Sequence, residues 1–343
     1  PRGEEGMKNW TIITDKIKRE GKNKRYNCII GVSGGTDSSY LLHVSKKIYG
    51  LKPLAVNLDN GWSSEIAVQN IKKVTSALNI DLETYVIDYE EIKDLLRTYI
   101  KAGLPWIDNP TDLAIQSVLF KIASQENIKY ILVGNDFRSE GKQPTEWTYS
   151  DQKQLKYLHE KFGSVKLKSY PLISIYKYFY LSLVKGIRLY YPFNYLEYNK
   201  QSAQALLKET YDWAYYGEHH YENLFTKWAI GHWMYEKFGI DKRIITYSAQ
   251  VLSGMMSREQ ALNIVKNSPY TPEKAKNDTE YVLKKLGFSQ QEFDLIWQSP
   301  NKTFLDYPSY YKMIKRLAKY DGLFLARFFK IRPKILFEMA ERK

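Results

Sequence analysis

Short apolar runs alternate with longer amphipathic stretches through the first half of the chain, and this alternation constrains the fold more than any other feature. Five runs rich in β-branched and aromatic residues predict strands, each ending in polar or glycine residues: 26–32, 53–59, 82–88, 129–134 and 165–171. Helical patterns lie between the first four of them, at 38–49, 64–78, 89–101 and 111–126. Strands and helices that alternate in this way are typical of a doubly wound α/β domain, a parallel sheet with helices on both faces.

A glycine turn directly follows the first predicted strand: Ser33-Gly34-Gly35-Thr36-Asp37-Ser38-Ser39, with an apolar helix after it. The two glycines permit a tight turn and close approach of the backbone to a ligand. Free N–H groups of the first helical turn and the helix dipole favour an anion there, and the serines add hydroxyl donors. The turn therefore predicts a phosphate-binding loop at the carboxyl end of the strand, where open α/β sheets bind ligands. The alternative is an ordinary capped turn whose Ser and Asp side chains only satisfy helix-end N–H groups.

Asp37 is an acidic residue inside this predicted anion site. A carboxylate beside a polyphosphate repels it unless a divalent cation lies between them, as Mg²⁺ commonly does. Asp37 is therefore a predicted magnesium ligand.

Charge and cysteine content narrow the class of protein. The 343 residues include 51 Lys and Arg against 38 Asp and Glu, a net charge of +13, which favours anionic partners such as nucleotides, nucleic acid or an acidic membrane surface. A hydrophobic content of 44% excludes a disordered polymer. The single cysteine, Cys28, excludes a disulfide scaffold and a cysteine-ligated zinc cluster within this chain, and it fits a reducing cytoplasm.

The glycine turn resembles the PP-loop of the ATP pyrophosphatases, the group that contains asparagine synthetase, GMP synthetase, argininosuccinate synthetase and several tRNA-modifying enzymes. It lacks the Gly-Lys-Ser/Thr of a Walker A loop. The resemblance implies a HUP-like fold of the adenine nucleotide alpha hydrolase type. It also implies that ATP is split to AMP and pyrophosphate, with the AMP activating a carbonyl or amide oxygen.

Further strings follow in order along the chain: Leu58-Asp59-Asn60-Gly61-Trp62, Asn109-Pro110-Thr111-Asp112, Gly134-Asn135-Asp136-Phe137-Arg138-Ser139-Glu140-Gly141, His220-Tyr221-Glu222, Phe238-Gly239-Ile240-Asp241-Lys242-Arg243 and Ser253-Gly254-Met255-Met256-Ser257-Arg258-Glu259. Together with the loop they resemble the N-acetyl sugar amidotransferases of surface-polysaccharide biosynthesis, over roughly residues 22–290. Those enzymes turn a sugar acetamido group into an acetamidino group. Members of that family carry paired cysteines in a segment before this region, and since this chain has none, no metal-binding cysteine is assigned.

The resemblance implies a reaction in two steps. The acetamido oxygen attacks the α-phosphate of ATP to give an adenylated imidate, and then ammonia adds and AMP leaves. The loop N–H groups, Mg²⁺ and a protein cation are expected to stabilise the charge that builds on pyrophosphate. Lys242 or Arg243 is the candidate cation, and a solvated helix end is the alternative for both.

The strand ends supply the other candidates for the nucleotide and the metal. Asp59, Asn60 and Trp62 lie where this fold is expected to hold adenosine, with Trp62 either stacked on the base or covering the sheet edge. The residues after the fourth predicted strand supply further candidates. Gly134 and Asn135 are candidate nucleotide contacts, Asp136 is a candidate second metal ligand, and Glu140 is a candidate catalytic carboxylate. The alternative for these residues is that they are ordinary charged residues of a surface loop. The candidate substrate contacts are Asp112, Arg138, His220 and Tyr221. The aromatic residues around His220 are alternatively core packing.

The resemblance also implies partners. The substrate is expected to be an acetamido sugar carried on a nucleotide, or a nonulosonic acid. Since Cys28 lies in the first strand and supplies no glutaminase nucleophile, a separate class I glutaminase subunit, resembling that of imidazole glycerol phosphate synthase, is expected to deliver ammonia. No nucleic-acid partner is expected.

Two other functions remain open at this point. A PP-loop tRNA-modifying enzyme shares the loop and is often basic, although thiolation generally needs a cysteine pair that this chain lacks. A non-catalytic interaction protein that keeps the fold is the other.

The chain divides by pattern into three parts: an N-terminal arm (1–24) with a short charged helix at 11–20, a PP-loop ATP-binding domain (25–171), and a helical, aromatic-rich region (172–343) for substrate or partner. The basic tail, 310–343, alternates Lys and Arg with apolar residues at helical spacing. Packing against the second region, peripheral contact with an anionic membrane and docking of a partner subunit are its possible roles.

Overall fold

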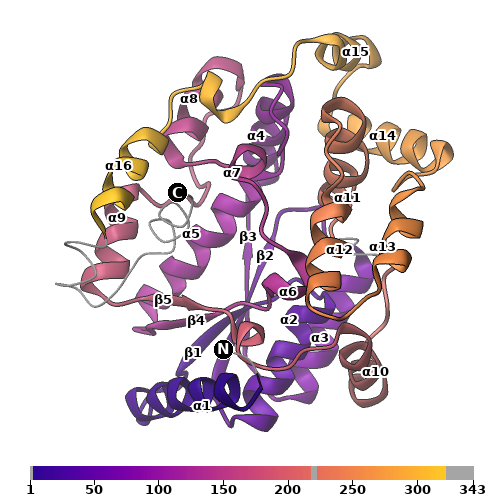
Figure 1. Ribbon diagram of the computed structural model, residues 1–343. Helices are drawn as coiled ribbons and strands as arrows, with labels where there is room; N and C mark the ends of the chain where they lie inside the picture. The colour runs from indigo at the N-terminus through magenta and orange to yellow at the C-terminus, as the bar shows by residue number, and fades with distance from the viewer. Residues whose placement is uncertain (1–2, 218–221, 322–343) are drawn as a thin grey trace.

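A single parallel sheet organises the first half of the chain in the computed structural model, which describes residues 3–217 and 222–321 (Figure 1). Its strands lie in the order β3-β2-β1-β4-β5 and comprise β1 Cys28–Gly31, β2 Pro53–Asp59, β3 Leu82–Val86, β4 Tyr130–Leu132 and β5 Arg188–Tyr190. The order runs outward from β1 in one direction to β3 and in the other to β5. The topological switch point, where such sheets bind ligands, therefore lies between β1 and β4.

Helices cover both faces of the sheet. On one face the strands pack with α1 Gly3–Glu20, α2 Thr36–His43, α3 Glu65–Ala77 and α10 Lys200–Tyr211. On the other face they pack with α5 Asn109–Gln125 and α9 Ile175–Phe179. Side chains of β1 alternate accordingly, since Ile30 belongs to the first of these clusters and Ile29 to the second.

A helical region packs beside the sheet domain. Its described helices are α11 Leu224–Trp228, α12 Lys242–Leu252, α13 Arg258–Val265, α14 Pro272–Leu286 and α15 Gln290–Gln298, with a π-helical stretch Ala229–Lys237 after α11. It shares one hydrophobic cluster with α4 Tyr89–Lys101 and α8 Gln152–Phe162. The remaining short helical elements are α6 Phe137–Glu140, α7 Thr145–Thr148, the π-helical turns Val44–Ile48 and Tyr180–Val184, and the 3₁₀ turns Pro192–Asn194 and Phe304–Asp306. The predicted doubly wound α/β fold with a helical C-terminal region is confirmed.

The prediction of a fifth strand at 165–171 is wrong. Backbone N–H groups of this segment donate to buried carboxylates of α4, those of Lys168 and Ser169 to Glu91 and that of Val165 to Asp94, at 2.6–3.1 Å. They are therefore not available for a strand ladder. The edge position is taken by β5, Arg188–Tyr190, which pairs with β4. The sheet thus continues past residue 171, the expected end of the ATP-binding domain.

Both ends of the described chain pack on the sheet domain. The helix expected at 11–20 begins at Gly3, and its Trp10 is 1% exposed within the cluster that includes β1 and α2. At the other end, α16 Tyr311–Asp321 buries Ile314 and Ala318 against Ile175 of α9. The first part of the basic tail thus packs on the fold, and residues 322–343 lie outside the described residues. Among the described helices, none combines the length and the apolar character that a membrane crossing requires.

Candidate active site

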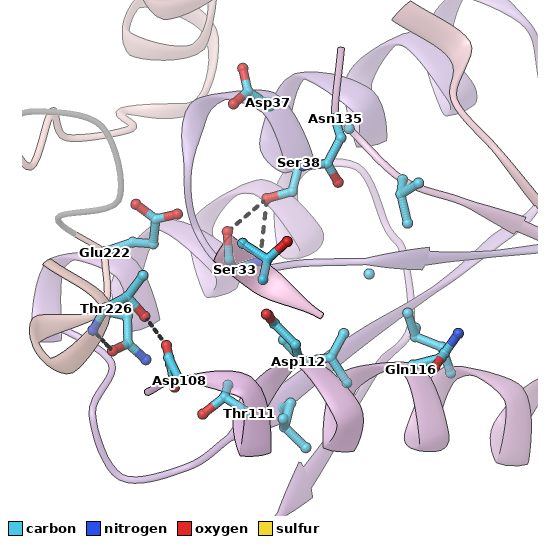
Figure 2. A pocket seen from close by; sticks show the side chains of 18 of the residues that line it. Ser33, Asp37, Ser38, Asp108, Thr111, Asp112, Gln116, Asn135, Glu222 and Thr226 are labelled. Atoms are coloured by element: carbon cyan, nitrogen blue, oxygen red, sulfur yellow. Dashed lines mark hydrogen bonds between the residues drawn. The ribbon is translucent and has the colours of Figure 1, made fainter. Parts of the chain in front are cut away.

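A cavity of about 760 Å³ opens at the topological switch point (Figure 2). Its walls come from the carboxyl ends of β1, β2 and β4, from the start of α5, and from α6 and α12. The volume lies in the range of about 300–1,000 Å³ that ligand pockets commonly have. Nine of the candidate residues line it: Ser33, Asp37, Ser38, Asn60, Asp112, Gly134, Asn135, Glu140 and Lys242.

The glycine loop, residues 33–39, is held by contacts that depend on glycine. Gly34 has φ +80°, and a Cβ added there would lie 2.2 Å from the carbonyl oxygen of Ala67 in α3. Gly134, at the end of β4, allows a second close approach, since its Cβ would lie 2.8 Å from the carbonyl carbon of Asp37. Glycine at these two positions lets α3 and β4 close on the loop.

The start of α2 is not a capped turn of the ordinary kind. Its N-cap is Gly35, and no side chain caps it. The loop serines bond within the loop instead: Ser33 N–H donates to Ser38 Oγ at 3.2 Å and Gly35 N–H donates to Ser33 Oγ at 3.3 Å. Thr36 N–H donates to the hydroxyl of Tyr216 at 3.3 Å. The alternative, in which Ser and Asp side chains cap α2, is therefore wrong.

Two loop residues face away from the cavity lining. Thr36 is fully buried and accepts from Gln204 Nε2 at 3.2 Å. Ser39 is 2% exposed, and its N–H donates to Gly35 O. Gly34, Gly35, Thr36 and Ser39 therefore form the frame of the loop, while Ser33, Asp37 and Ser38 face the cavity.

Asp37 lies at the cavity wall with two partners, one just before α10 and one at the first residue of α10. The Tyr198 hydroxyl donates to Asp37 Oδ1, and the Lys200 ammonium lies 3.7 Å from Oδ2. Sequence reasoning missed both partners, since they follow the loop by some 160 residues. The described residues contain no group of three His, Cys, Asp or Glu side chains placed to hold a metal ion. Asp37 therefore belongs to no three-ligand group of that kind among those residues, although Glu140 and Glu222 lie near it.

Two further carboxyl groups of the cavity carry raised pKa values. Burial, and then the neighbouring Asp37, raises the pKa of Glu140 to about 7, although Asn135 Nδ2 donates to its Oε2 at 3.0 Å. Burial likewise raises the pKa of Glu222 to about 7. Perturbed carboxyl groups in a cleft are typical of functional sites.

Lys242 brings a positive charge into the cavity from α12. The side chain is partly accessible along its length, but its ammonium is enclosed by protein and lies 4.4 Å from the centre of the Trp106 ring. Desolvation lowers the pKa of Lys242 to about 8, while Asp112, Glu140 and Asp108 act in the opposite direction. Asp112 faces Ser33 across the cavity (Figure 2). Its Oδ2 accepts from Trp106 Nε1 at 2.7 Å.

The structure gives Asp136 and Arg138 structural contacts in place of the predicted metal and substrate ones. Asp136 is 2% exposed, accepts from the N–H groups of Arg138 and Ser139, and forms an ion pair with Arg138 at 3.2 Å. The Arg138 guanidinium also donates to the carbonyl oxygens of Phe193 and Leu196. Neither side chain lines the cavity, because each is used to anchor α6 to the segment after β5.

Three more candidates lie outside the cavity. Trp62 is fully buried and tilted against Phe225, so no face of its ring is open to a base; it packs in the hydrophobic cluster that α4 shares with the helical region. Asp59 Oδ1 accepts from Gly61 N–H at 2.8 Å and so shapes the turn after β2. Arg243 is paired with Asp241 at 2.7 Å, which leaves Lys242 as the cation of that run that reaches the cavity.

His220 and Tyr221 lie outside the described residues. Next to them, Asn223 and Thr226 line the cavity, which sequence reasoning missed. Of the adenosine candidates, Asn60 alone lines it; its Nδ2 donates to Thr111 Oγ1 at 3.0 Å.

Comparison with solved structures gives distant similarities. NMN synthetase from Francisella tularensis has a TM-score of 0.40 at 15% identity, over 84% of this chain and 97% of that chain. The NH3-dependent NAD synthetase from Campylobacter jejuni has a TM-score of 0.32 at 16% identity, over 80% and 96%. The U34-tRNA thiolase NcsA from Methanococcus maripaludis has a TM-score of 0.34 at 14% identity, over 74% and 82%. These TM-scores are low, so the similarities do not define the chemistry of this chain.

Sequence comparison covers the chain in part. A stretch of 136 residues is 31% identical to an uncharacterized protein of Methanocaldococcus jannaschii, over 40% of this chain and 47% of that protein, so the chain spans about half the length of the curated relative it matches. Residues 222–319 match the family described as "LPS biosynthesis protein WbpG-like, C-terminal domain". That part of the chain is therefore similar to a lipopolysaccharide-biosynthesis domain, which confirms there the resemblance to surface-polysaccharide proteins that the motifs indicated.

Proposed function

We propose that the protein is an ATP-dependent amidotransferase of surface-polysaccharide biosynthesis, which converts an acetamido group of a sugar to an acetamidino group with formation of AMP and pyrophosphate. One observation carries the proposal. A single cavity joins a glycine loop at the start of α2 to an enclosed lysine and to carboxyl groups with raised pKa values. The match of residues 222–319 to a lipopolysaccharide-biosynthesis domain supports the substrate class.

The loop end of the cavity would hold the phosphates of ATP. Ser33 and Ser38 supply hydroxyl groups, and the uncapped start of α2 supplies backbone N–H groups and a favourable dipole. Backbone donors fixed by Gly34 and Gly134 need no reorganisation as charge develops on pyrophosphate. Lys242 lies across the same cavity and is the cation proposed to stabilise that charge further.

The first step forms a bond between the acetamido oxygen and the α-phosphorus of ATP. The bond from that phosphorus to the bridging oxygen breaks, and its electron pair leaves with pyrophosphate. The proton on the acetamido nitrogen is released as the neutral imidate forms, and Glu140, with a pKa of about 7, is suited to accept it. Ammonia then adds to the imidate carbon and AMP leaves.

The residues present fit a magnesium ion that is bound mainly by the substrate. Asp37 is the one predicted metal ligand that faces the cavity, and Mg²⁺ beside nucleotides usually keeps water and phosphate ligands around one or two carboxylates. When bound, the ion would neutralise charge on the phosphates.

We further propose that a separate glutaminase subunit supplies the ammonia, and that residues 322–343 of the basic tail contact an anionic membrane or a partner subunit. The chain alone is then expected to use ammonium salts and to hydrolyse glutamine poorly. Ammonium-dependent turnover that exceeds glutamine-dependent turnover by the purified chain is the expected result.

Mass spectrometry tests the reaction. The chain is incubated with ATP, Mg²⁺, ammonium chloride and a panel of sugars that carry two acetamido groups, linked to uridine or cytidine nucleotides. Conversion lowers the mass by the difference between an oxygen atom and an NH group, and AMP appears in equal amount. Unchanged sugars together with a modified tRNA in a parallel incubation would support the tRNA-modifying alternative, and release of ADP would contradict both.

Variants of the loop test the site. Ser33→Ala and Asp37→Ala are expected to abolish AMP formation while the protein stays folded. Ser45→Ala is the matched control, because Ser45 is 1% exposed and lies outside the cavity. Unfolding of both loop variants, with Ser45→Ala folded, would mean that the loop side chains are structural.

A further inference from the structure

Asp108 is a cavity carboxyl group to which no role has been given so far. It occupies the N-cap position of α5, where an aspartate normally accepts hydrogen bonds from the first helical turn, yet its side chain makes no such cap. It is 2% exposed and lines the cavity. Since this buried carboxyl group does not cap the helix, capping does not explain why an aspartate stands at this position.

The contacts of Asp108 hold it toward the cavity instead. Thr226 Oγ1, from α11, donates to Oδ2 at 2.5 Å, as Figure 2 shows. Its Oδ1 is buried and has no hydrogen-bond partner among the described residues. Asn223, the N-cap of α11, accepts from Thr226 N–H at 3.0 Å and fixes the threonine in turn. The Thr226 hydroxyl therefore positions the carboxyl group through Oδ2, while the second oxygen, Oδ1, is left without such a bond.

Burial and the charges around Asp108 bring its pKa close to neutral pH, so that both of its protonation states are populated there. Burial, and then Asp112, raises the pKa of Asp108 to about 7, while the Thr111 and Thr226 hydroxyls and the Lys242 ammonium lower it. A base whose pKa lies near the working pH is well matched to proton transfer. Glu140 and Glu222 are the other such groups, but both lie near Asp37 at the glycine-loop end of the cavity, Glu140 beside Asn135 and Glu222 beside Gly35.

We propose that Asp108 binds the incoming ammonium through its carboxylate and accepts the proton that the nitrogen loses when it attacks the adenylated imidate. This inference rests on the proposed function and adds to it the base of the second step. The ammonium gives one proton to Asp108, and the nitrogen lone pair forms a bond to the imidate carbon. The bond from that carbon to the AMP oxygen breaks, and its electron pair leaves with AMP. The product is the protonated amidine, and Asp108 releases its proton to water.

The experiment separates the two half-reactions in Asp108→Asn. The first half is followed as sugar-dependent exchange of labelled pyrophosphate into ATP, using the sugar of the panel that the wild-type chain converts. The second half is followed as amidine formed from ammonium chloride. We expect exchange close to the wild-type rate and amidine formation lowered by about 10²-fold or more, the usual loss when a general base is removed.

Hydroxylamine supplies a readout that a structural role would not move. It is far less basic than ammonia and is neutral near pH 7, so it attacks without first losing a proton to the protein. With hydroxylamine in place of ammonium, Asp108→Asn is expected to form the N-hydroxyamidine at close to the wild-type rate. Asp94→Asn is the matched control, since Asp94 is 4% exposed, accepts several hydrogen bonds and lies outside the cavity.

Each other outcome is decisive. Wild-type amidine formation by Asp108→Asn overturns the inference, as does loss of exchange from a folded variant, since Asp108 would then act before the amine. If Asp108→Asn does not fold, Asp108→Ser is measured by the same assays. Absence of exchange from the wild-type chain with every sugar overturns the proposed function instead, so the two failures are distinguishable.

Discussion

Replacing Gly34 by alanine tests whether the phosphate loop depends on its contact with α3. Gly34 has φ +80°, and the new Cβ would lie 2.2 Å from the carbonyl oxygen and 2.8 Å from the Cα of Ala67. A left-handed conformation costs an L-residue roughly 1–2 kcal/mol. The clash is with helix backbone, which no side-chain rotation relieves, and overpacking of this kind adds about 1–3 kcal/mol. Gly34→Ala is therefore expected to lower the free energy of unfolding by about 2–5 kcal/mol.

Gly50→Ala is the matched control for this variant. Gly50 has φ +60°, and an added Cβ meets no atom within 4 Å. It should lose only the conformational contribution of roughly 1–2 kcal/mol. Urea unfolding followed by tryptophan fluorescence measures both variants, and their difference isolates the contact between loop and helix.

The same pair of variants links stability to ligand binding. Because relief of the clash moves the loop backbone away from α3, Gly34→Ala is expected to bind ATP more weakly in calorimetry, whereas Gly50→Ala binds as the wild type does. Equal free energies of unfolding for the two variants would refute the reasoning, since the clash would then contribute nothing.

Three further predictions concern buried charge. Arg138→Met is expected to lower the free energy of unfolding by about 3–5 kcal/mol, because it leaves the Asp136 carboxylate buried without its partner; wild-type urea unfolding with weaker sugar binding would instead support a substrate contact. Lys242→Met is expected to slow AMP formation by about 10²-fold without lowering Tm, since burying an ammonium is itself costly; a lower Tm with unchanged AMP formation would contradict this. The pKa values of Asp108 and Glu140 lie at about 7 in the fold, above their ordinary values, so the native state binds extra protons below that pH. Their contribution to stability is complete below about pH 4 and is lost as pH rises through 7, so the free energy of unfolding should fall between about pH 4 and pH 7, and less so in Glu140→Gln. An unchanged slope in that variant would show that Glu140 titrates normally.

Local features were predictable from the sequence. The phosphate loop follows from glycines next to a strand and a helix, all within one short segment, and α4 has the predicted bounds, Tyr89–Lys101. The parallel sheet with helices on both faces follows from the alternation of strands and helices. These features depend on neighbours in the chain, which a single sequence displays.

The misplaced features depend on distant partners. The segment 165–171 has strand composition, but Glu91 and Asp94 take its N–H groups. Arg138 is the residue type expected at a phosphate or sugar, and carbonyl groups more than fifty residues away occupy it instead. Trp62 lies in a suitable motif but is covered by α11. Asp108 could not be singled out from the sequence, where it simply precedes a helix start that contains proline. Its proposed role depends on the contact with Thr226 of α11, which is distant in the chain.

The shared hydrophobic cluster between α4 and the helical region has a consequence for how such a chain unfolds. Trp228 and Trp233, inside the segment similar to a lipopolysaccharide-biosynthesis domain, are fully buried, and Trp233 Nε1 donates to the Leu104 carbonyl at 2.9 Å. Neither half can melt without exposing indole rings of the other, so calorimetry should record one cooperative transition. The carboxyl group of Asp108 and the ammonium of Lys242 would then separate in that same event, and a partly unfolded chain that keeps the cavity intact would not be populated.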